Sequence, residues 1–222
     1  RLARAAAKVV AVELDRSLLP VLDETLAGLD NVEVLSGDIL KLDIGALVEE
    51  KFPGLTPMAC ANLPYNITTP VLTALIDSGR FSRITVMIQR EVARRICAAP
   101  GTPDYGAFSV YCQFYTLPEL LFDVGPECFV PAPKVTSSVL RMTPRETLPQ
   151  GVTDARRFFR VVKAAFGQRR KTLLNALSAG LGGVDKDTIR AAIAACGLPE
   201  DIRGERLGIP EFAALTTALG PF

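Results

Sequence analysis

Four consecutive residues, Asn62, Leu63, Pro64 and Tyr65, directly follow the apolar run 58–61 and are suited to holding a flat, amine-bearing substrate. An exocyclic aromatic amine such as N6 of adenine is a poor nucleophile because its lone pair is delocalised into the ring. Two acceptors aligned on its two N–H bonds favour a pyramidal nitrogen whose lone pair points at an electrophile. The Asn62 side-chain oxygen and a backbone carbonyl at Leu63 or Pro64 are candidate acceptors, and the Tyr65 ring offers a stacking surface. The alternative is a turn with an asparagine cap and no chemistry.

The composition removes many other mechanisms. Histidine is absent from the 222 residues, which excludes imidazole bases, Ser-His or Cys-His nucleophiles and histidine-bound metals. The five cysteines are scattered without a C-x-x-C pair, which argues against a disulfide framework and a zinc site. We therefore expect no metal, and catalysis by positioning and electrostatic preorganisation. No apolar run reaches the ~18 residues of a membrane span, so we expect a cytoplasmic protein.

Acidic residues recur where predicted strands end. Glu13 and Asp15 close the run 8–15, and Asp38 closes 31–38 after Gly37. In a doubly wound sheet, ligands bind outside the carboxyl ends of the strands, and an acid there hydrogen-bonds ribose hydroxyls. The Asp38 carboxylate is also suited to accepting from an adenine amine. Taken singly, each acid is equally well explained as a helix N-cap.

Strands and helices alternate in the first half of the chain, which predicts βαβ units, a parallel sheet and an α/β fold. Expected strands cover 8–15, 31–38, 56–65 and 84–89, with helices over 16–29, 44–52, 90–98 and from about residue 69. From residue 105 the pattern predicts late, partly antiparallel strands over 108–124 and 134–144, joined by a proline-stiffened loop over 125–135. Residues 143–154 form the best candidate linker.

Beyond the linker the chain is predicted to be helical and is basic. Phe159, Val162, Phe166, Leu173 and Leu177 recur at helical spacings along 158–177 and predict one buried face. Residues 1–150 have a net charge of −3 and residues 151–222 of +4, and 153–175 hold seven basic residues and one acidic one. Such a segment indicates a polyanionic partner or a solvated helix face.

These motifs together resemble a known family. The strand-end acid, "GDIL", "NLPYNITTP", "FVPAPKV", "FGQRRKTLLNAL" and "RGERLGIPEFAAL", in this order, are similar to the ribosomal RNA adenine N6-dimethyltransferases. The resemblance is strongest to the bacterial members that dimethylate two adjacent adenines in a hairpin loop near the 3′ end of small-subunit (16S) rRNA. It implies a Rossmann-like class I methyltransferase domain over 1–147 and a helical rRNA-binding domain over 153–222. The family's first strand and glycine loop would precede Arg1, so we expect an N-terminally truncated sheet.

The resemblance also implies roles for individual residues. S-adenosyl-L-methionine would be the cofactor, with Glu13 on its ribose and Asp38 and Ile39 at its adenine. Asn62 and Pro64 match the acceptors for the target amine, and Tyr65 and Phe129 the rings on the two faces of the flipped base. The residues expected to contact rRNA phosphates are Arg90, Arg94, Arg95, Arg169, Arg170 and Lys171.

Two other functions stay open at this stage. One is a non-catalytic RNA-binding factor in ribosome assembly, which would use the same basic surface without a cofactor. The other is methylation of DNA or of large-subunit rRNA through the same Asn-Leu-Pro-Tyr chemistry. The leading prediction is an rRNA adenine dimethyltransferase acting on the assembling 30S subunit as a monomer, without a membrane partner.

Overall fold

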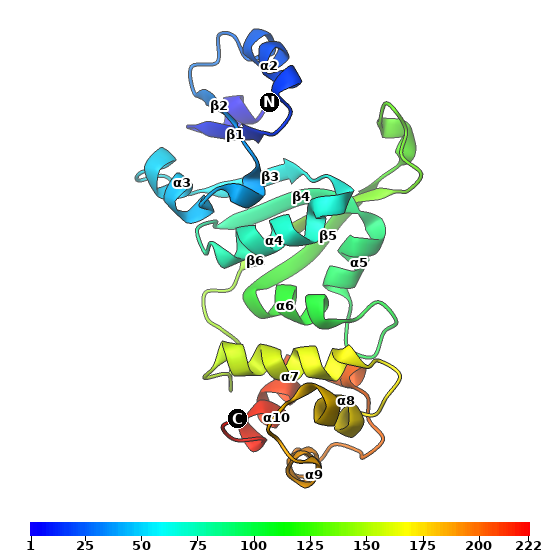
Figure 1. Ribbon diagram of the computed structural model, residues 1–222. Coiled ribbons are helices and arrows are strands. Elements are labelled where there is room, and N and C mark those ends of the chain that lie inside the picture. Colours follow the sequence, from blue (N-terminus) through cyan, green and yellow to red (C-terminus); the bar gives the residue numbers. More distant parts are fainter. The chain divides into compact units, whose positions relative to one another are not determined.

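The computed structural model describes all residues from 1 to 222. By its internal contacts the chain divides into two compact units, residues 1–86 and residues 87–222. Figure 1 shows the elements of both units. The domain boundary expected near residues 147–153 falls inside the second unit and stays a prediction.

The first unit begins with a small parallel sheet. Strand β1 (Val9–Glu13) pairs with β2 (Val32–Ser36) in the register Val9 to Val32 through Glu13 to Ser36. Helix α1 (Leu2–Ala5) leads into β1, and α2 (Leu19–Thr25) connects the two strands. Pro20 lies in the first turn of α2, where its missing N–H costs no hydrogen bond. The predicted strand-helix-strand order is confirmed here.

The rest of the first unit supplies the third strand and the helices beside it. Helix α3 (Ile44–Lys51) is capped by Asp43, whose side chain accepts from the amide of Ala46. Strand β3 (Met58–Asn62) follows, then α4 (Thr68–Asp77) and β4 (Arg83–Gln89). Strand β3 is not part of the β1–β2 sheet. It is the first strand of a second sheet with the order β3-β4-β6-β5.

The second unit contains an antiparallel pair of strands. It also has a helix where part of a strand was predicted. Strands β5 (Thr116–Val124) and β6 (Ser137–Pro144) pair antiparallel, with an irregularity between Leu120 and Phe122. Helix α5 (Arg90–Cys97) precedes them, and residues 125–135 form the expected loop around a short 3-10 turn, Pro126–Cys128.

The prediction of a strand from residue 108 was wrong, because α6 occupies Ala107–Tyr115. The Gly106 amide donates to the Ser109 hydroxyl, which caps the helix start. Phe108, Tyr111 and Tyr115 follow the helical three- and four-residue spacing, with ring centroids 5.9 and 5.2 Å apart. The aromatic and β-branched composition suggested a strand, whereas the spacing of the rings was that of a helix.

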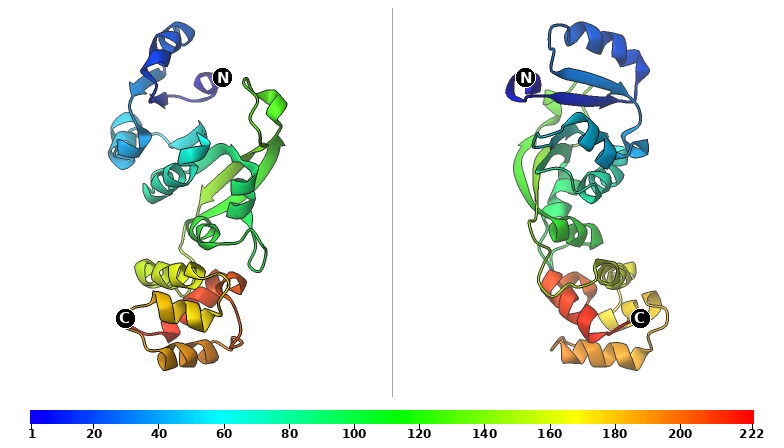
Figure 2. Two further views of the ribbon diagram at one scale, coloured as in Figure 1. Left: turned by 45° about the vertical axis from the view of Figure 1, so that its right-hand side comes forward. Right: turned by 90° about the vertical axis from the view of Figure 1, so that its left-hand side faces the viewer.

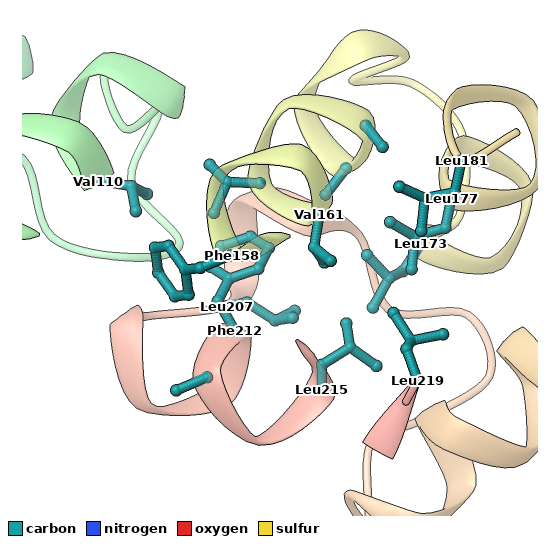
Figure 3. Packing of buried hydrophobic residues seen from close by; sticks show 14 of the residues in the cluster. Val110, Phe158, Val161, Leu173, Leu177, Leu181, Leu207, Phe212, Leu215 and Leu219 are labelled. Atoms are coloured by element: carbon teal, nitrogen blue, oxygen red, sulfur yellow. The ribbon is translucent and has the colours of Figure 1, made fainter. Parts of the chain in front are cut away.

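The remaining helices of the second unit pack around one apolar core. They are α7 (Ala155–Gly167), α8 (Leu173–Gly180), α9 (Lys186–Ala195) and α10 (Ile209–Ala218), and both views of Figure 2 show them side by side. Figure 3 shows Phe158, Leu177 and Phe212 pointing into this core, and all three are fully buried. The core also includes Tyr105 and Phe114, so it continues into the segment around α6.

The helical run expected over 158–177 is interrupted. Helix α7 ends at Gly167, and α8 begins at Leu173 after Thr172, whose side chain accepts from the amide of Asn175. Because of this break the seven-residue step from Phe166 to Leu173 does not follow one helix face. Phe158 is completely buried, while Phe159 is partly exposed. None of the helices has both the length and the apolar character needed to cross a bilayer.

The close approach of α8 to α7 gives a stability prediction. A Cβ on Gly180 would lie 2.6 Å from the Ala164 Cβ and 2.9 Å from its Cα. We expect Gly180→Ala to lower the free energy of unfolding by about 1–3 kcal/mol through overpacking, although alanine is the better helix former. Urea denaturation followed by circular dichroism measures the difference. Gly182→Ala is the control, because nothing lies within 4 Å of its added Cβ; equal midpoints for the two variants would contradict the packing argument.

Candidate active site

A cavity of about 390 Å³ in the first unit brings together the predicted strand-end residues. Its polar end is formed where β1, β2 and β3 finish, since parallel strands present their carboxyl ends on one side. The predicted residues in its lining are Glu13, Asp38, Ile39, Asn62, Leu63 and Pro64. Tyr65 follows directly in the next turn but does not line the cavity. Sequence reasoning missed Leu14, which directly follows β1 and also lines the cavity.

Backbone hydrogen bonds hold the two acids at this end. The Gly37 amide donates to the Glu13 carbonyl at 2.9 Å, which joins the ends of β1 and β2. The Asp38 Oδ1 accepts from the Leu40 amide at 3.0 Å, while its Oδ2 lies 4.0 Å from the Lys41 ammonium. Asp38 is therefore both a turn cap and a cavity residue, and one of its oxygens makes only a distant ion pair.

Glu13 and Asp15 have different local roles. Asp15 accepts from the Ser17 hydroxyl at 2.6 Å and the Ser17 amide at 2.9 Å, and these bonds lower the pKa of the Asp15 carboxyl. Asp15 is thus the cap of the turn Arg16–Leu18 and is not part of the cavity lining. Glu13 lines the cavity, and one of its oxygens accepts from the Asp15 amide at 2.8 Å.

The turn after β3 distinguishes the two candidate carbonyls. The Pro64 carbonyl accepts from the Ile67 amide at 3.2 Å and from the Thr68 hydroxyl at 3.1 Å, so both of its lone pairs have donors. No such bond within this turn engages the Leu63 carbonyl. The Leu63 side chain is 6% exposed and anchors the turn, whereas Asn62 is exposed at the strand end. Of the two carbonyls left open by the sequence, Leu63 is the one available to a ligand.

Phe129 and the basic residues lie in the second unit. Phe129 is half-buried at the end of the turn Pro126–Cys128, and the next residue, Val130, is fully exposed. On α5, Arg95 pairs with Glu91 at 2.8 Å, and the Arg90 guanidinium lies 3.7 Å from Asp123. Both arginines thus have carboxylate partners on the protein surface.

The remaining predicted basic residues differ in whether they have partners within the protein. Arg169 donates to the carbonyls of Pro103 at 3.0 Å and Tyr105 at 3.2 Å, and lies 3.7 Å from Glu205. It therefore ties separate segments of its own unit together. Arg94, Arg170 and Lys171 are exposed and make no ion pair.

Sequence reasoning noted the basic segment 153–175 but did not assign its helix α7 residues. Arg156, Arg160 and Lys163 are exposed at four- and three-residue intervals, so they share one helix face. The Arg160 guanidinium lies 4.7 Å from the centre of the Phe222 ring. The helical spacing of the three cations was the signal that could have identified this face.

Known structures share this fold. A dimethyladenosine transferase from Plasmodium falciparum superposes with a TM-score of 0.76 at 22% identity, over 96% of this chain and 82% of that one. The 23S rRNA methyltransferase ErmE gives a TM-score of 0.72 at 23% identity, over 99% and 85% of the two chains. The chain thus has the α/β fold of class I methyltransferases.

The family follows from sequence similarity. The family model "Ribosomal RNA adenine dimethylase" matches residues 1–194, and the chain belongs to this family. The ribosomal RNA small subunit methyltransferase A of Alkaliphilus oremlandii is 46% identical over 98% of this chain and 76% of its own length. The protein of the same name from Geobacillus thermodenitrificans is 45% identical over 100% and 77%. The chain is thus related to enzymes that methylate rRNA, as the motifs predicted.

The different surroundings of Arg169 and Arg170 give a second prediction. Arg169→Ala removes two hydrogen bonds to backbone carbonyls, and we expect the melting temperature to fall by about 2–4 °C, as for a loss of ~1 kcal/mol in a protein of this size. Arg170→Ala, the matched control next to it, is expected to leave the melting temperature unchanged. Differential scanning calorimetry tests both. A larger fall for Arg170→Ala than for Arg169→Ala would show that the assignment is reversed.

Proposed function

We propose that this protein transfers methyl groups from S-adenosyl-L-methionine to N6 of two adjacent adenines near the 3′ end of small-subunit rRNA. The observation that carries the proposal is the shared lining of one cavity by two strand-end acids and the Asn62 turn. Relatives named as small-subunit rRNA methyltransferases at about 45% identity support the choice of small-subunit rRNA as the substrate. We expect the protein to work as a monomer in the cytoplasm, on rRNA of the assembling 30S subunit.

The chemistry of the cavity end fits an adenosyl group. Ribose hydroxyls and an adenine amine are hydrogen-bond donors, and the cavity offers them the carboxylates of Glu13 and Asp38. Ile39, next to Asp38, adds apolar surface for the adenine ring. S-adenosyl-L-methionine supplies a methyl group on a positively charged sulfur, which is the electrophile that an amine attacks.

The Asn62 turn is assigned to the target amine. The Asn62 side-chain oxygen and the Leu63 carbonyl would each accept one N–H of the adenine amine, which frees the nitrogen lone pair for attack. Pro64 stiffens the turn, and its own carbonyl, held by Ile67 and Thr68, keeps the turn in shape. A fixed turn reduces the entropy lost in aligning the amine. The amine loses its proton after attack, so no histidine base is required.

The rings and cations complete the proposed RNA site. Tyr65 is assigned to one face of the flipped adenine, and Phe129 stays a prediction for the other. Arg94, Arg170, Lys171 and two residues of the α7 face, Arg156 and Lys163, are assigned to rRNA phosphates, because they are exposed. Arg90, Arg95, Arg160 and Arg169 already have partners within the protein, which makes them weaker candidates.

Cofactor binding is testable apart from methyl transfer. We expect Asp38→Asn to weaken S-adenosyl-L-methionine binding by about tenfold or more, because a charged acceptor is replaced by an amide at the adenine end. Isothermal titration calorimetry measures the dissociation constant. Asp23→Asn on α2 removes the same charge from an exposed site that does not line the cavity. Equal weakening by both substitutions would mean that net charge, not a contact of Asp38, affects binding.

The amine-acceptor role of Asn62 has its own test. We expect Asn62→Ala to lower the methylation rate on small ribosomal subunits by about 10²–10³-fold, the usual effect of losing one preorganised polar contact in a transition state. RNA affinity, measured by filter binding, should be nearly unchanged. Asn66→Ala, four residues away, exposed and outside the cavity lining, serves as the control. An Asn62→Ala variant with normal turnover would refute the assignment.

A further inference from the structure

Phe129 lies on a loop, residues 125–135, that joins β5 to β6 and extends beyond the ends of both strands (Figure 1). Three prolines, at positions 126, 131 and 133, restrict its backbone, and two amides inside it donate to carbonyls three residues earlier at 3.1 Å. None of its side chains makes a hydrogen bond or an ion pair with the rest of the chain. The direction in which this stiff loop carries Phe129 is therefore determined at its base.

The carboxylate of Asp123 joins three elements at the base of the loop. Asp123 lies on β5, two residues before the loop begins, and is paired with Ser138 of β6. Its Oδ1 accepts from the Ser138 hydroxyl at 2.5 Å, and its Oδ2 lies 3.7 Å from the guanidinium of Arg90 at the start of α5. The Arg90 amide also donates to the carbonyl of Thr136, directly after the loop, at 3.0 Å. Both ends of the loop are thus connected to α5 through one residue.

These contacts fix geometry more than they add stability. The Arg90 and Asp123 side chains are each 42% exposed, and an ion pair so open to water contributes little to the free energy of unfolding. Ser138 is fully buried, so its hydroxyl cannot bond to bulk water and stays directed at the carboxylate. One carboxylate therefore has its two oxygens held from two different elements, β6 and α5.

We propose that Asp123 is a positioning residue, which fixes the loop so that the Phe129 ring stacks on the target adenine. The inference rests on the proposed function, in which Phe129 takes that role. Arg90, predicted from the sequence to contact rRNA, acts here as a partner of Asp123. Removing the carboxylate leaves both Ser138 and Arg90 without their acceptor, so the base of the loop loosens. A misplacement of about 1 Å in a group that orients the substrate lowers the reaction rate by as much as about 10²-fold.

The loop can be observed without cofactor or RNA, because the chain contains no tryptophan. Phe129→Trp places a single indole on the loop, and its fluorescence anisotropy and its quenching by acrylamide report nanosecond motion and solvent access. We expect Asp123→Ala, added to this variant, to lower the anisotropy and to raise the quenching constant. Asp123→Asn keeps an acceptor for Ser138 and the shape of the side chain, so we expect a smaller change in the same direction.

Glu119 provides the matched control, because it makes the same kind of contact farther from the loop. It lies on β5 and pairs with Arg141, directly opposite on β6. Glu119→Ala therefore removes a carboxylate from the same pair of strands without changing the base of the loop, and it should leave the indole anisotropy unchanged. Circular dichroism checks that each variant is folded. An equal loss of anisotropy for Asp123→Ala and Glu119→Ala, or no loss for either, would overturn the proposal.

Methyl transfer tests the consequence in the chain with its native Phe129. We expect Asp123→Ala to lower kcat on small ribosomal subunits by about 10- to 10²-fold, because the ring is displaced from the base. The KM for the subunits should be nearly unchanged, since phosphate contacts supply most of the RNA affinity. Glu119→Ala should keep both constants. A looser loop with unchanged kcat would refute the positioning role. If the unmodified chain transferred no methyl group, the proposed function would fail instead, and the anisotropy alone would decide whether Asp123 fixes the loop.

Discussion

The hydrogen bond from the Gly37 amide to the Glu13 carbonyl holds together the two strand ends on which the site depends. It continues the β1–β2 ladder one residue past the last strand pair, so Asp38 turns away beside Glu13. Two residues after each strand an aspartate caps the following turn, Asp15 after β1 and Asp38 after β2, and each uses one carboxylate oxygen to do so. Backbone geometry thereby places Glu13 and Asp38 at one end of the cavity, without any direct contact between them.

The Asn62 turn follows the same logic. Its shape is maintained by bonds to the Pro64 carbonyl from Ile67 and Thr68, and by the buried side chain of Leu63. The polar group presented to the cavity, Asn62, is left exposed at the strand end. Because the turn is already ordered in the folded chain, little entropy is lost in ordering it when a ligand binds. Helix α4, which begins at Thr68, helps to order the turn.

In the second unit, some basic residues bond to other parts of the protein, and others are exposed without an ion pair. Arg169 ties the backbone at Pro103 and Tyr105 to the region of Glu205, and Arg95 pairs along its own helix. A positive charge in a sequence motif is therefore weak evidence for a phosphate contact until its partners are known. Arg156 and Lys163 on α7 and Arg170 and Lys171 before α8 have the stronger case, because an incoming phosphate does not have to displace a partner within the protein.

Much of the local structure follows from the sequence alone, because periodicity and caps are local properties. The strands β1 to β4, the helices between them, the loop around Phe129 and the motif at Asn62 were all predictable from residue types and spacing. The absence of histidine also limits the chemistry without any structure. The helix α6 and the break between α7 and α8 were not predicted, since aromatic composition outweighed spacing in one case and continuous helical spacing concealed a turn in the other.

Only the tertiary structure decided which of the predicted residues share a cavity and which groups remain free. The residues alone left Leu63 or Pro64 as the carbonyl acceptor, the family resemblance implied Pro64, and Arg169 and Arg170 were assigned the same role. The fold separates both pairs, because a hydrogen bond within the protein uses up a donor or acceptor that the sequence shows as available. The Pro64 carbonyl is engaged within its own turn, and Arg169 is bonded to the distant carbonyls of Pro103 and Tyr105.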